Sequence, residues 1–369
     1  MLGWNALPRP RPLSLALQGG GAHGAYTWGV LDALLESGRF DFDGISGTSA
    51  GAMNAIVMAH GLASVAAGAS RPRAAEAARE ALASFWEALA TQLPFDWLTG
   101  GDVSNPTLSP AARILMQWSQ VLAPHQLNPL QLNPLRDVLE RHVDFERLRR
   151  DSPVRLFIAA TQANTGRLRL FRNAEMSVDV ALASACLPTL HPAVLIDGEP
   201  YWDGGYSANP ALFPLVQHAR APDLLIVLLS NPQHTATPTS VADIRLRALE
   251  IGFNAAFLRE AVALGEACAQ ARHPTFVIGA QERRLVRLRF HLIDASDALG
   301  HLSAHTRMLP HRPFLQWLFE QGRARTRAWL AHEGCRVGQL GTVDLQALFA
   351  CRSPATLDDG RRADELLAG

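Results

Sequence analysis

Gly44-Ile-Ser-Gly-Thr-Ser-Ala-Gly51 is the stretch of this sequence that decides the fold. Its last five residues, Gly47 to Gly51, form a G-x-S-x-G pattern centred on Ser49. In such a pattern the serine stands on a tight turn between a strand and a helix, and the flanking glycines leave room for the turn to close. The turn presents the serine hydroxyl at a helix N-terminus, where partial positive charge favours a developing anion.

The residues on either side of this turn have the character that the motif requires. Phe40, Phe42 and Ile45 precede it and predict a short buried strand. The segment from Ala50 to Ala59 follows it and is small and apolar, which is typical of a helix packed closely on a sheet. A glycine-rich turn without chemistry is the alternative, so the motif needs support from the rest of the chain.

A second glycine-rich segment, Gly19-Gly-Gly-Ala-His-Gly24, lies upstream of the first. Leu13 to Gln18 alternates between apolar and small or polar residues and predicts the first strand. Ala25 to Leu35 has apolar residues at helical spacing. The glycine-rich loop is therefore expected to join a strand to a helix.

This loop has two functional interpretations besides a plain tight turn. The spacing of its glycines matches a dinucleotide-binding fingerprint, and Asp41 or Asp43 lies near the spacing of a ribose-binding acid. Alternatively, consecutive glycines let backbone amides point into one small space and form an oxyanion hole. Ser49 favours the oxyanion hole, because a nucleophilic serine requires such donors and a nucleotide site does not.

A third motif, Asp203-Gly-Gly205, follows the aromatic pair Tyr201-Trp202. The order of residues predicts an aspartate at the end of a strand, beside glycines with unusual backbone freedom. A hairpin or loop turn is the alternative, because Asp-Gly is common in turns. Downstream, Leu224 to Leu229 is the clearest buried strand, and we expect it to be parallel and central.

In chain order these three motifs, together with Ala183-Ser-Ala-Cys-Leu-Pro188, resemble the patatin-like phospholipase family of lipid acyl hydrolases. The resemblance covers roughly residues 13 to 229. It implies an α/β fold, a three-layer α/β/α sandwich around a central, mostly parallel sheet. It also implies a catalytic dyad without metal or cofactor, in which Ser49 is the nucleophile and Asp203 orients and deprotonates it.

The resemblance also implies an oxyanion hole and one departure from the family pattern. The residues expected to form the hole are Gly19, Gly20, Gly21, Gly24 and Ala50, and the motif glycines are Gly47, Gly51, Gly204 and Gly205. The family usually carries Arg or Lys at the position of His23. A histidine there would make the charge beside the loop titratable, which predicts a pH dependence in the histidine range.

Two other functions remain open at this point. A carboxylate of ordinary pKa is a weak base toward an alkyl hydroxyl, so a dyad requires burial to raise the pKa. An α/β-hydrolase-type esterase would instead use a Ser-His-Asp triad, with His291, His301 or His305 as base. Its serine usually follows several strands, whereas Ser49 follows only two. A non-catalytic lipid- or protein-binding module is the other alternative, and the presence of both dyad residues argues against it.

Composition narrows the class of protein. The chain has 369 residues, 48% of them hydrophobic, and a formal net charge of zero, which is typical of a globular protein and argues against nucleic acid as a partner. The N-terminus lacks a signal-peptide core, and the apolar stretch from Ala50 to Ala69 is interrupted by polar residues. The four cysteines show no metal-ligand spacing. We expect a cytoplasmic enzyme with a lipid or other acyl-ester substrate, and peripheral membrane contact stays open.

The expected organisation has three parts. Residues 1–12 form an N-terminal extension, 13–230 a catalytic core, and 231–369 a mostly helical part packed on the same domain. A proline-rich apolar insert at about 93–135, with a helix at 111–122, is expected to shape access to the substrate. Two segments that alternate arginine with apolar residues, 167–172 and 287–291, predict half-exposed strands.

Overall fold

The computed structural model describes residues 10–66, 68–92, 99–110, 133–230, 237–273 and 279–350. Its strands are β1 (Arg11–Leu17), β2 (Phe40–Thr48), β3 (Thr99–Asp102), β4 (Asn105–Leu108), β5 (Arg155–Gln162), β6 (Leu168–Arg172), β7 (Val194–Ile196), β8 (Glu199–Asp203), β9 (Asp223–Leu228) and β10 (Arg289–Asp294). Eight of them form one sheet, in which β10, β9, β1, β2 and β5 are parallel neighbours. The other three, β6, β8 and β7, join it in antiparallel pairs.

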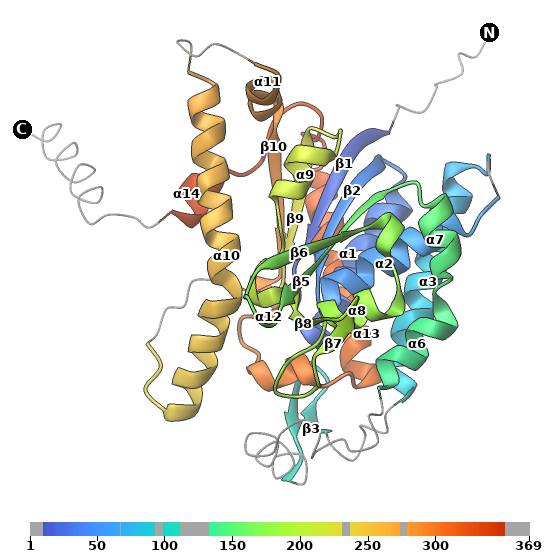
Figure 1. Ribbon diagram of the computed structural model, residues 1–369, viewed down its shortest axis with the longest axis vertical. Helices are drawn as coiled ribbons and strands as arrows, with labels where there is room; N and C mark the ends of the chain where they lie inside the picture. The colour runs from blue at the N-terminus through green and yellow to red at the C-terminus, as the bar shows by residue number, and fades with distance from the viewer. Residues whose placement is uncertain are drawn as a thin grey trace, which may run out of the picture.

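Helices cover both faces of this sheet (Figure 1). The α-helices are α1 (Gly24–Ser37), α2 (Ala50–Ala63), α3 (Arg71–Gln92), α6 (Pro134–His142), α7 (Phe145–Asp151), α8 (Val178–Ser184), α9 (Phe213–His218), α10 (Val241–Ala271), α11 (Ala280–Arg287), α12 (Ser296–Leu299), α13 (Arg312–His332) and α14 (Leu345–Phe349). Short 3-10 helices are η1 (Gly21–His23), η3 (Asn173–Glu175), η4 (Gly204–Tyr206) and η5 (Ala304–Met308). The predicted α/β/α sandwich with a mostly parallel sheet is confirmed.

Alternation along β1 shows how the sequence builds the two layers. Leu13, Leu15 and Leu17 pack into the larger core with α1, α2, α3 and α13, whereas Ala16 faces the smaller core with α9 and α10. Successive side chains of a strand point to opposite faces, so a run that is apolar on both faces belongs inside a covered sheet. The same holds for β9, whose six residues are all buried between β1 and β10.

Some boundaries differ from those predicted. The first strand begins at Arg11, within the predicted extension 1–12. The segment 287–291 is not one half-exposed strand, because Arg287 ends α11 and Phe290 and His291 are buried between β9 and a bridge to Val343. The predicted helix at 111–122 and most of the insert lie outside the described residues. No helix within the described ranges is both long and apolar enough to cross a membrane.

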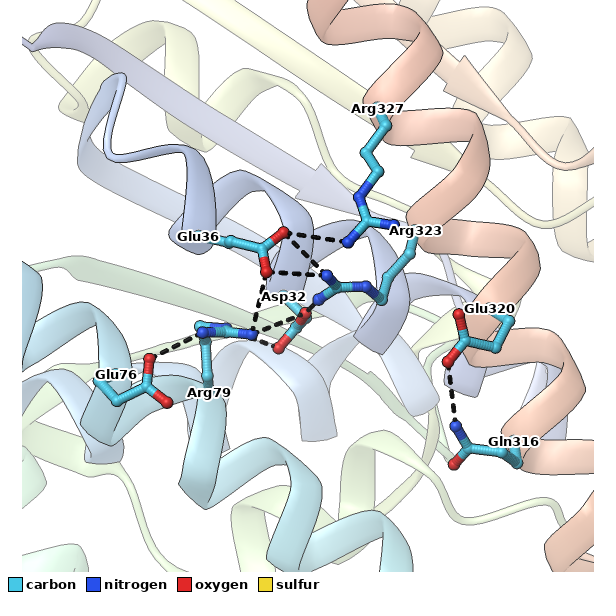
Figure 2. A network of polar contacts seen from close by, with 8 residues as sticks. All are labelled: Asp32, Glu36, Glu76, Arg79, Gln316, Glu320, Arg323 and Arg327. Atoms are coloured by element: carbon cyan, nitrogen blue, oxygen red, sulfur yellow. Dashed lines mark hydrogen bonds and ion pairs between the residues drawn. The ribbon is translucent and has the colours of Figure 1, made fainter.

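Helix α13, in the last third of the chain, is tied to the N-terminal half by a network of charges (Figure 2). Arg323 of α13 pairs with Asp32 and with Glu36 of α1, the latter at 2.8 Å. Arg79 of α3 bonds the same Asp32 at 2.8 Å. Asp32 and Arg323 are nearly buried, so each charge depends on its partner for stabilisation. The network therefore fixes α1, which follows the glycine-rich loop, against two other helices.

Replacing Gly322 with alanine is expected to destabilise this helix contact. Helices α1 and α13 cross at Gly29 and Gly322, and a Cβ added at Gly322 would lie 2.1 Å from the carbonyl oxygen of Tyr26. Backbone cannot yield as a flexible side chain would, so we expect a loss of about 1–3 kcal/mol in the free energy of unfolding. Chemical denaturation measures it, and Gly252→Ala is the matched control, because that helical glycine faces open space. Equal unfolding midpoints for the two variants would contradict the contact.

Candidate active site

Ser49 stands on a strained turn between β2 and α2. Its backbone angles are φ 53° and ψ −122°, and within the described residues only Asp197 is another non-glycine residue with positive φ. Such strain is costly and persists where the surrounding structure imposes it, often at functional sites. The Ser49 amide donates a hydrogen bond to Ser184 Oγ at 3.0 Å. The turn therefore has the form expected of a nucleophile elbow, with the half-buried serine at the N-terminus of α2.

The register of the sheet brings Asp203 to this turn. Along one side of β5, β2 pairs as far as Thr48 opposite Ala159, and then leaves the sheet at Ser49. The strand β8 takes its place there, with Asp203 opposite Ala160. Because β6 pairs with the other side of β5, β2 and β8 lie on the same side of it. The C-terminal ends of these two strands therefore meet. Ser49 and Asp203 are thus neighbours in space, although they lie 154 positions apart in the sequence.

Asp203 is buried, with 1% of its surface exposed. Its Oδ1 accepts a hydrogen bond from the Gly205 amide at 2.7 Å. Burial raises the pKa of this carboxyl to about 7, against the lowering effects of the Gly205 amide and of a hydrogen bond with the Ser49 side chain. The carboxyl is therefore a stronger base than a free aspartate, which removes the main chemical objection to a dyad.

The glycine-rich loop lies beside the elbow because β1 and β2 are parallel neighbours, with Leu17 opposite Gly47. A Cβ added at Gly19 would lie 2.8 Å from Ser49 Cβ. The Gly19 amide, however, donates to Asn209 Oδ1 at 2.7 Å. The Gly24 amide turns back to the carbonyl groups of Gly21 and Ala22. The amides of Gly19 and Gly24 are therefore already hydrogen-bonded. These two residues shape the site but do not offer a hydrogen bond to a substrate.

The other three predicted donors remain available. The amides of Gly20, Gly21 and Ala50 make no hydrogen bond to any residue in the described part of the chain. Gly21 has φ 58°, and a Cβ there would lie 2.2 Å from the carbonyl oxygen of Arg307 in η5. Only glycine fits this conformation and this contact, so the loop is held from behind by the C-terminal third of the chain.

The remaining motif glycines sit in equally close contacts. For Gly47, Gly51, Gly204 and Gly205, the atom nearest to an added Cβ would lie between 2.2 and 2.6 Å away. At Gly51 that atom is the carbonyl oxygen of Leu17, and at Gly204 it is the carbonyl oxygen of Ala159. Gly51 and Gly204 let the elbow and the Asp203 turn approach the sheet backbone, whereas Gly205 leaves room for the ring of Phe253.

The prediction that His23 titrates in the histidine range is wrong. The ring is buried, and its Nε2 lies 2.7 Å from Thr306 Oγ1. Burial, followed by the charge of Arg307, lowers the pKa of His23 to about 3. His23 is therefore neutral near pH 7. The cation beside the loop is Arg307 itself, which pairs with Glu250 of α10 at 3.3 Å.

Within the described residues, neither the nucleotide-binding site nor a triad with His291 is assembled. Asp41 and Asp43 lie at the amino end of β2, whereas the glycine loop follows the carboxyl end of the parallel strand β1, so neither acid reaches a nucleotide on that loop. His291 lies on β10, three strands from β2, and its ring bonds Asp223 at 3.0 Å and Thr342 at 3.1 Å. Three strand spacings are roughly 14 Å, too far for a base acting on Ser49.

The other two histidines proposed for the triad, His301 and His305, have exposed side chains. Among the residues that the structure describes, no group of three His, Cys, Asp or Glu side chains is arranged to hold a metal ion.

Sequence reasoning missed the polar side chains that brace the site. Gln18 Oε1 accepts from the amides of Leu229 and Ser230, and Gln18 Nε2 donates to Asn254 Oδ1 of α10 at 2.9 Å. With Asn209, this glutamine joins the glycine loop to β9, α10 and the segment after Asp203. The available signal was weak: a glutamine that ends an apolar strand, and an asparagine six residues after Asp203.

This chain is similar to one protein family and to several solved structures. The family model described as "Patatin-like phospholipase" matches residues 15–216, more than half of the chain. No curated relative matches significantly. Among solved structures, VipD from Legionella pneumophila is similar over 88% of this chain and 67% of its own, with 15% identity and a TM-score of 0.40. ExoU of Pseudomonas aeruginosa, solved with SpcU, is similar over 98% and 85%, with 15% identity and a TM-score of 0.25. On the match to the family model, this chain belongs to the patatin-like phospholipase family.

Proposed function

We propose that the protein is a serine acyl hydrolase that cleaves carboxylic esters of lipids through a dyad of Ser49 and Asp203. One observation carries the proposal: β8 replaces β2 beside β5, so that a buried aspartate lies beside a strained serine whose side chain lowers the pKa of the carboxyl. Family membership supports the coarser activity, hydrolysis of a lipid ester.

The residues divide the chemistry as follows. Asp203 accepts the Ser49 hydroxyl proton while Ser49 Oγ forms a bond to the ester carbonyl carbon. The carbonyl oxygen becomes an oxyanion, which the amides of Gly20, Gly21 and Ala50 stabilise, each donor contributing about 3 kcal/mol in comparable sites. The proton returns from Asp203 to the leaving alcohol, and an acyl-Ser49 ester remains. Water then attacks this ester and gives a proton to Asp203, which passes it to Ser49 Oγ as the fatty acid leaves.

The activity should follow the ionisation of Asp203. Because the base form is the carboxylate, we expect kcat/KM to rise with pH and to reach a plateau above the Asp203 pKa of about 7. A rate profile over pH with a soluble ester measures this limb. His23→Gln is the control and should keep the limb, because the pKa of His23 lies near 3. A rate that stays level between acid and neutral pH would contradict the assignment. So would a limb whose midpoint shifts in His23→Gln.

The proposal is tested by labelling and by turnover. A fluorophosphonate probe should form a covalent adduct on Ser49, identified by mass spectrometry of the peptide that carries it. Nitrophenyl esters of increasing acyl length should be hydrolysed, and the preferred length then separates lipid substrates from small esters. Folded protein that gives neither an adduct nor turnover on any ester would remove the proposed function and favour a binding module on the same fold.

A further inference from the structure

A cavity of about 310 Å³ lies away from the active site, between α11 and the segment that leads into β9. Four of its seven lining residues are arginines, Arg220, Arg283, Arg284 and Arg287, and none is acidic. The formal net charge of the whole chain is zero. The arginines are therefore a local concentration of positive charge and do not reflect a basic protein in general.

The cavity and the active site lie at opposite ends of the parallel strands. Arg220 precedes the amino end of β9, and Arg287 precedes the amino end of β10. The glycine loop and Ser49 follow the carboxyl ends of β1 and β2, which are parallel to both strands. Six residues of strand span roughly 20 Å, so a ligand in this cavity does not contact Ser49.

Arg284 is a fixed part of the cavity wall. Its guanidinium donates to the backbone carbonyl groups of Leu215, Val216 and Ala219, at the C-terminal end of α9. Burial lowers the pKa of this arginine, and within the described residues it forms no ion pair. Carbonyl groups hold this cation, and Asp43 attracts it without forming an ion pair, so an anion in the cavity would stabilise it further.

Within the described residues, neither Asp43 nor Glu282 forms an ion pair with Arg220 or Arg287. Asp43 bonds the Arg155 guanidinium and accepts from the amides of Arg220 and Ala221, the latter at 2.8 Å. Its charge is thus matched by Arg155, which does not line the cavity. Glu282, in the first turn of α11, lies over Gly279. The side chains of Arg220 and Arg287 are exposed and can close on a ligand.

We propose that this cavity binds an anion that carries terminal phosphate groups. The planar guanidinium donates two parallel hydrogen bonds to phosphate, so several arginines around one space suit this ligand better than a carboxylate or a neutral sugar. The volume is at the lower end of the range of ligand pockets, roughly 300–1,000 Å³, which fits a small headgroup or a free phosphorylated metabolite. This site is independent of the ester hydrolysis proposed above.

The site is tested by calorimetry of tripolyphosphate binding to the whole 369-residue chain at physiological salt. We expect saturable binding, weakened about tenfold or more in the double variant Arg220→Gln/Arg287→Gln, because charge-assisted hydrogen bonds are lost. Arg284 is left in place, since it holds α9. The matched control, Arg73→Gln/Arg167→Gln, removes two exposed arginines elsewhere and should bind as the wild type does. No binding by the wild type, or equal loss in both double variants, would overturn the proposal.

Vesicles distinguish the two sources of phosphate. Sedimentation with phosphatidylcholine vesicles that contain phosphatidic acid, whose phosphate is terminal, is compared with phosphatidylglycerol at the same mole fraction. Retention by phosphatidic acid alone, lost in Arg220→Gln/Arg287→Gln and competed by tripolyphosphate, supports a lipid headgroup. Tripolyphosphate binding without sedimentation supports a free phosphorylated ligand. Equal sedimentation with both lipids, unchanged in the double variant, would indicate general attraction to anionic membranes and would contradict the site.

Discussion

Ser49→Ala is expected to reduce kcat/KM for ester hydrolysis by at least about 10³-fold, with the protein still folded. In the proposed mechanism no acyl-enzyme forms without this hydroxyl, and the proposed oxyanion donors alone contribute little to the rate. Alanine has the same Cβ as serine, so the backbone strain at φ 53° is unchanged, and the hydrogen bond from residue 49 to Ser184 uses the backbone. Initial rates with a nitrophenyl ester and the thermal midpoint measure the two effects.

Ser207→Ala is the matched control for this variant. Ser207 lies just after the Asp203 turn, and its Oγ is 2.8 Å from Thr161 Oγ1. It is a second serine near the buried carboxylate, but it has no strained turn and no helix N-terminus of its own. We expect it to keep most of the activity. Activity retained in Ser49→Ala, or lost equally in Ser207→Ala, would contradict the assignment of the nucleophile.

Asp203→Asn is expected to lower kcat/KM by about 10³- to 10⁴-fold, because an amide cannot take the Ser49 proton. The side-chain oxygen of asparagine still accepts from the Gly205 amide, so the turn is preserved. Asp197→Asn is the control: it removes the same charge from an exposed turn residue at φ 52°, a conformation that asparagine tolerates. Activity retained in Asp203→Asn would remove this residue from the mechanism.

Asp203→Asn should also become more stable relative to the wild type as pH rises. The pKa of Asp203 is about 7 in the folded protein and near its ordinary 3.8 when unfolded. Between these values the folded state holds the extra proton, so the wild type loses stability as pH increases from about 4 to 7. Asparagine has no such loss, and the difference in the free energy of unfolding should grow to a few kcal/mol and then level off above pH 7. A difference independent of pH would show that the carboxyl is not buried as described.

Local turns could be predicted from the sequence because their causes lie within a few residues. The elbow at Ser49 needs small residues on either side and a strand and a helix around it, and all of these are adjacent in the chain. The glycine loop after β1 is equally local, since the conformation of Gly21 is one that glycine adopts readily. The three motifs can therefore be predicted from neighbouring residues, and the layered fold follows from the family that these motifs resemble.

Which amides of the glycine loop stay available, and which groups beside it are charged, depends on residues far away in the sequence. Gly19 and Gly20 look alike in sequence, but Asn209, 190 positions away, takes only the Gly19 amide. His23 reads as a titratable residue, yet Thr306 and the helix α13 bury its ring, and Arg307 adds a positive charge. No periodicity or spacing near residue 23 contains this information, because desolvation depends on atoms that only folding brings close.

By itself, the sequence determined which segments turn, which strands are buried and which serine is strained, since these follow from side-chain volume, polarity and backbone freedom at neighbouring positions. Only the tertiary structure decided that β8 continues the place of β2 beside β5 and so sets a buried Asp203 against Ser49. Only it gathered Arg220 and the arginines of α11 around one cavity. The physical reason is that pairing, burial and electrostatic interaction act between atoms close in space, whatever their separation along the chain.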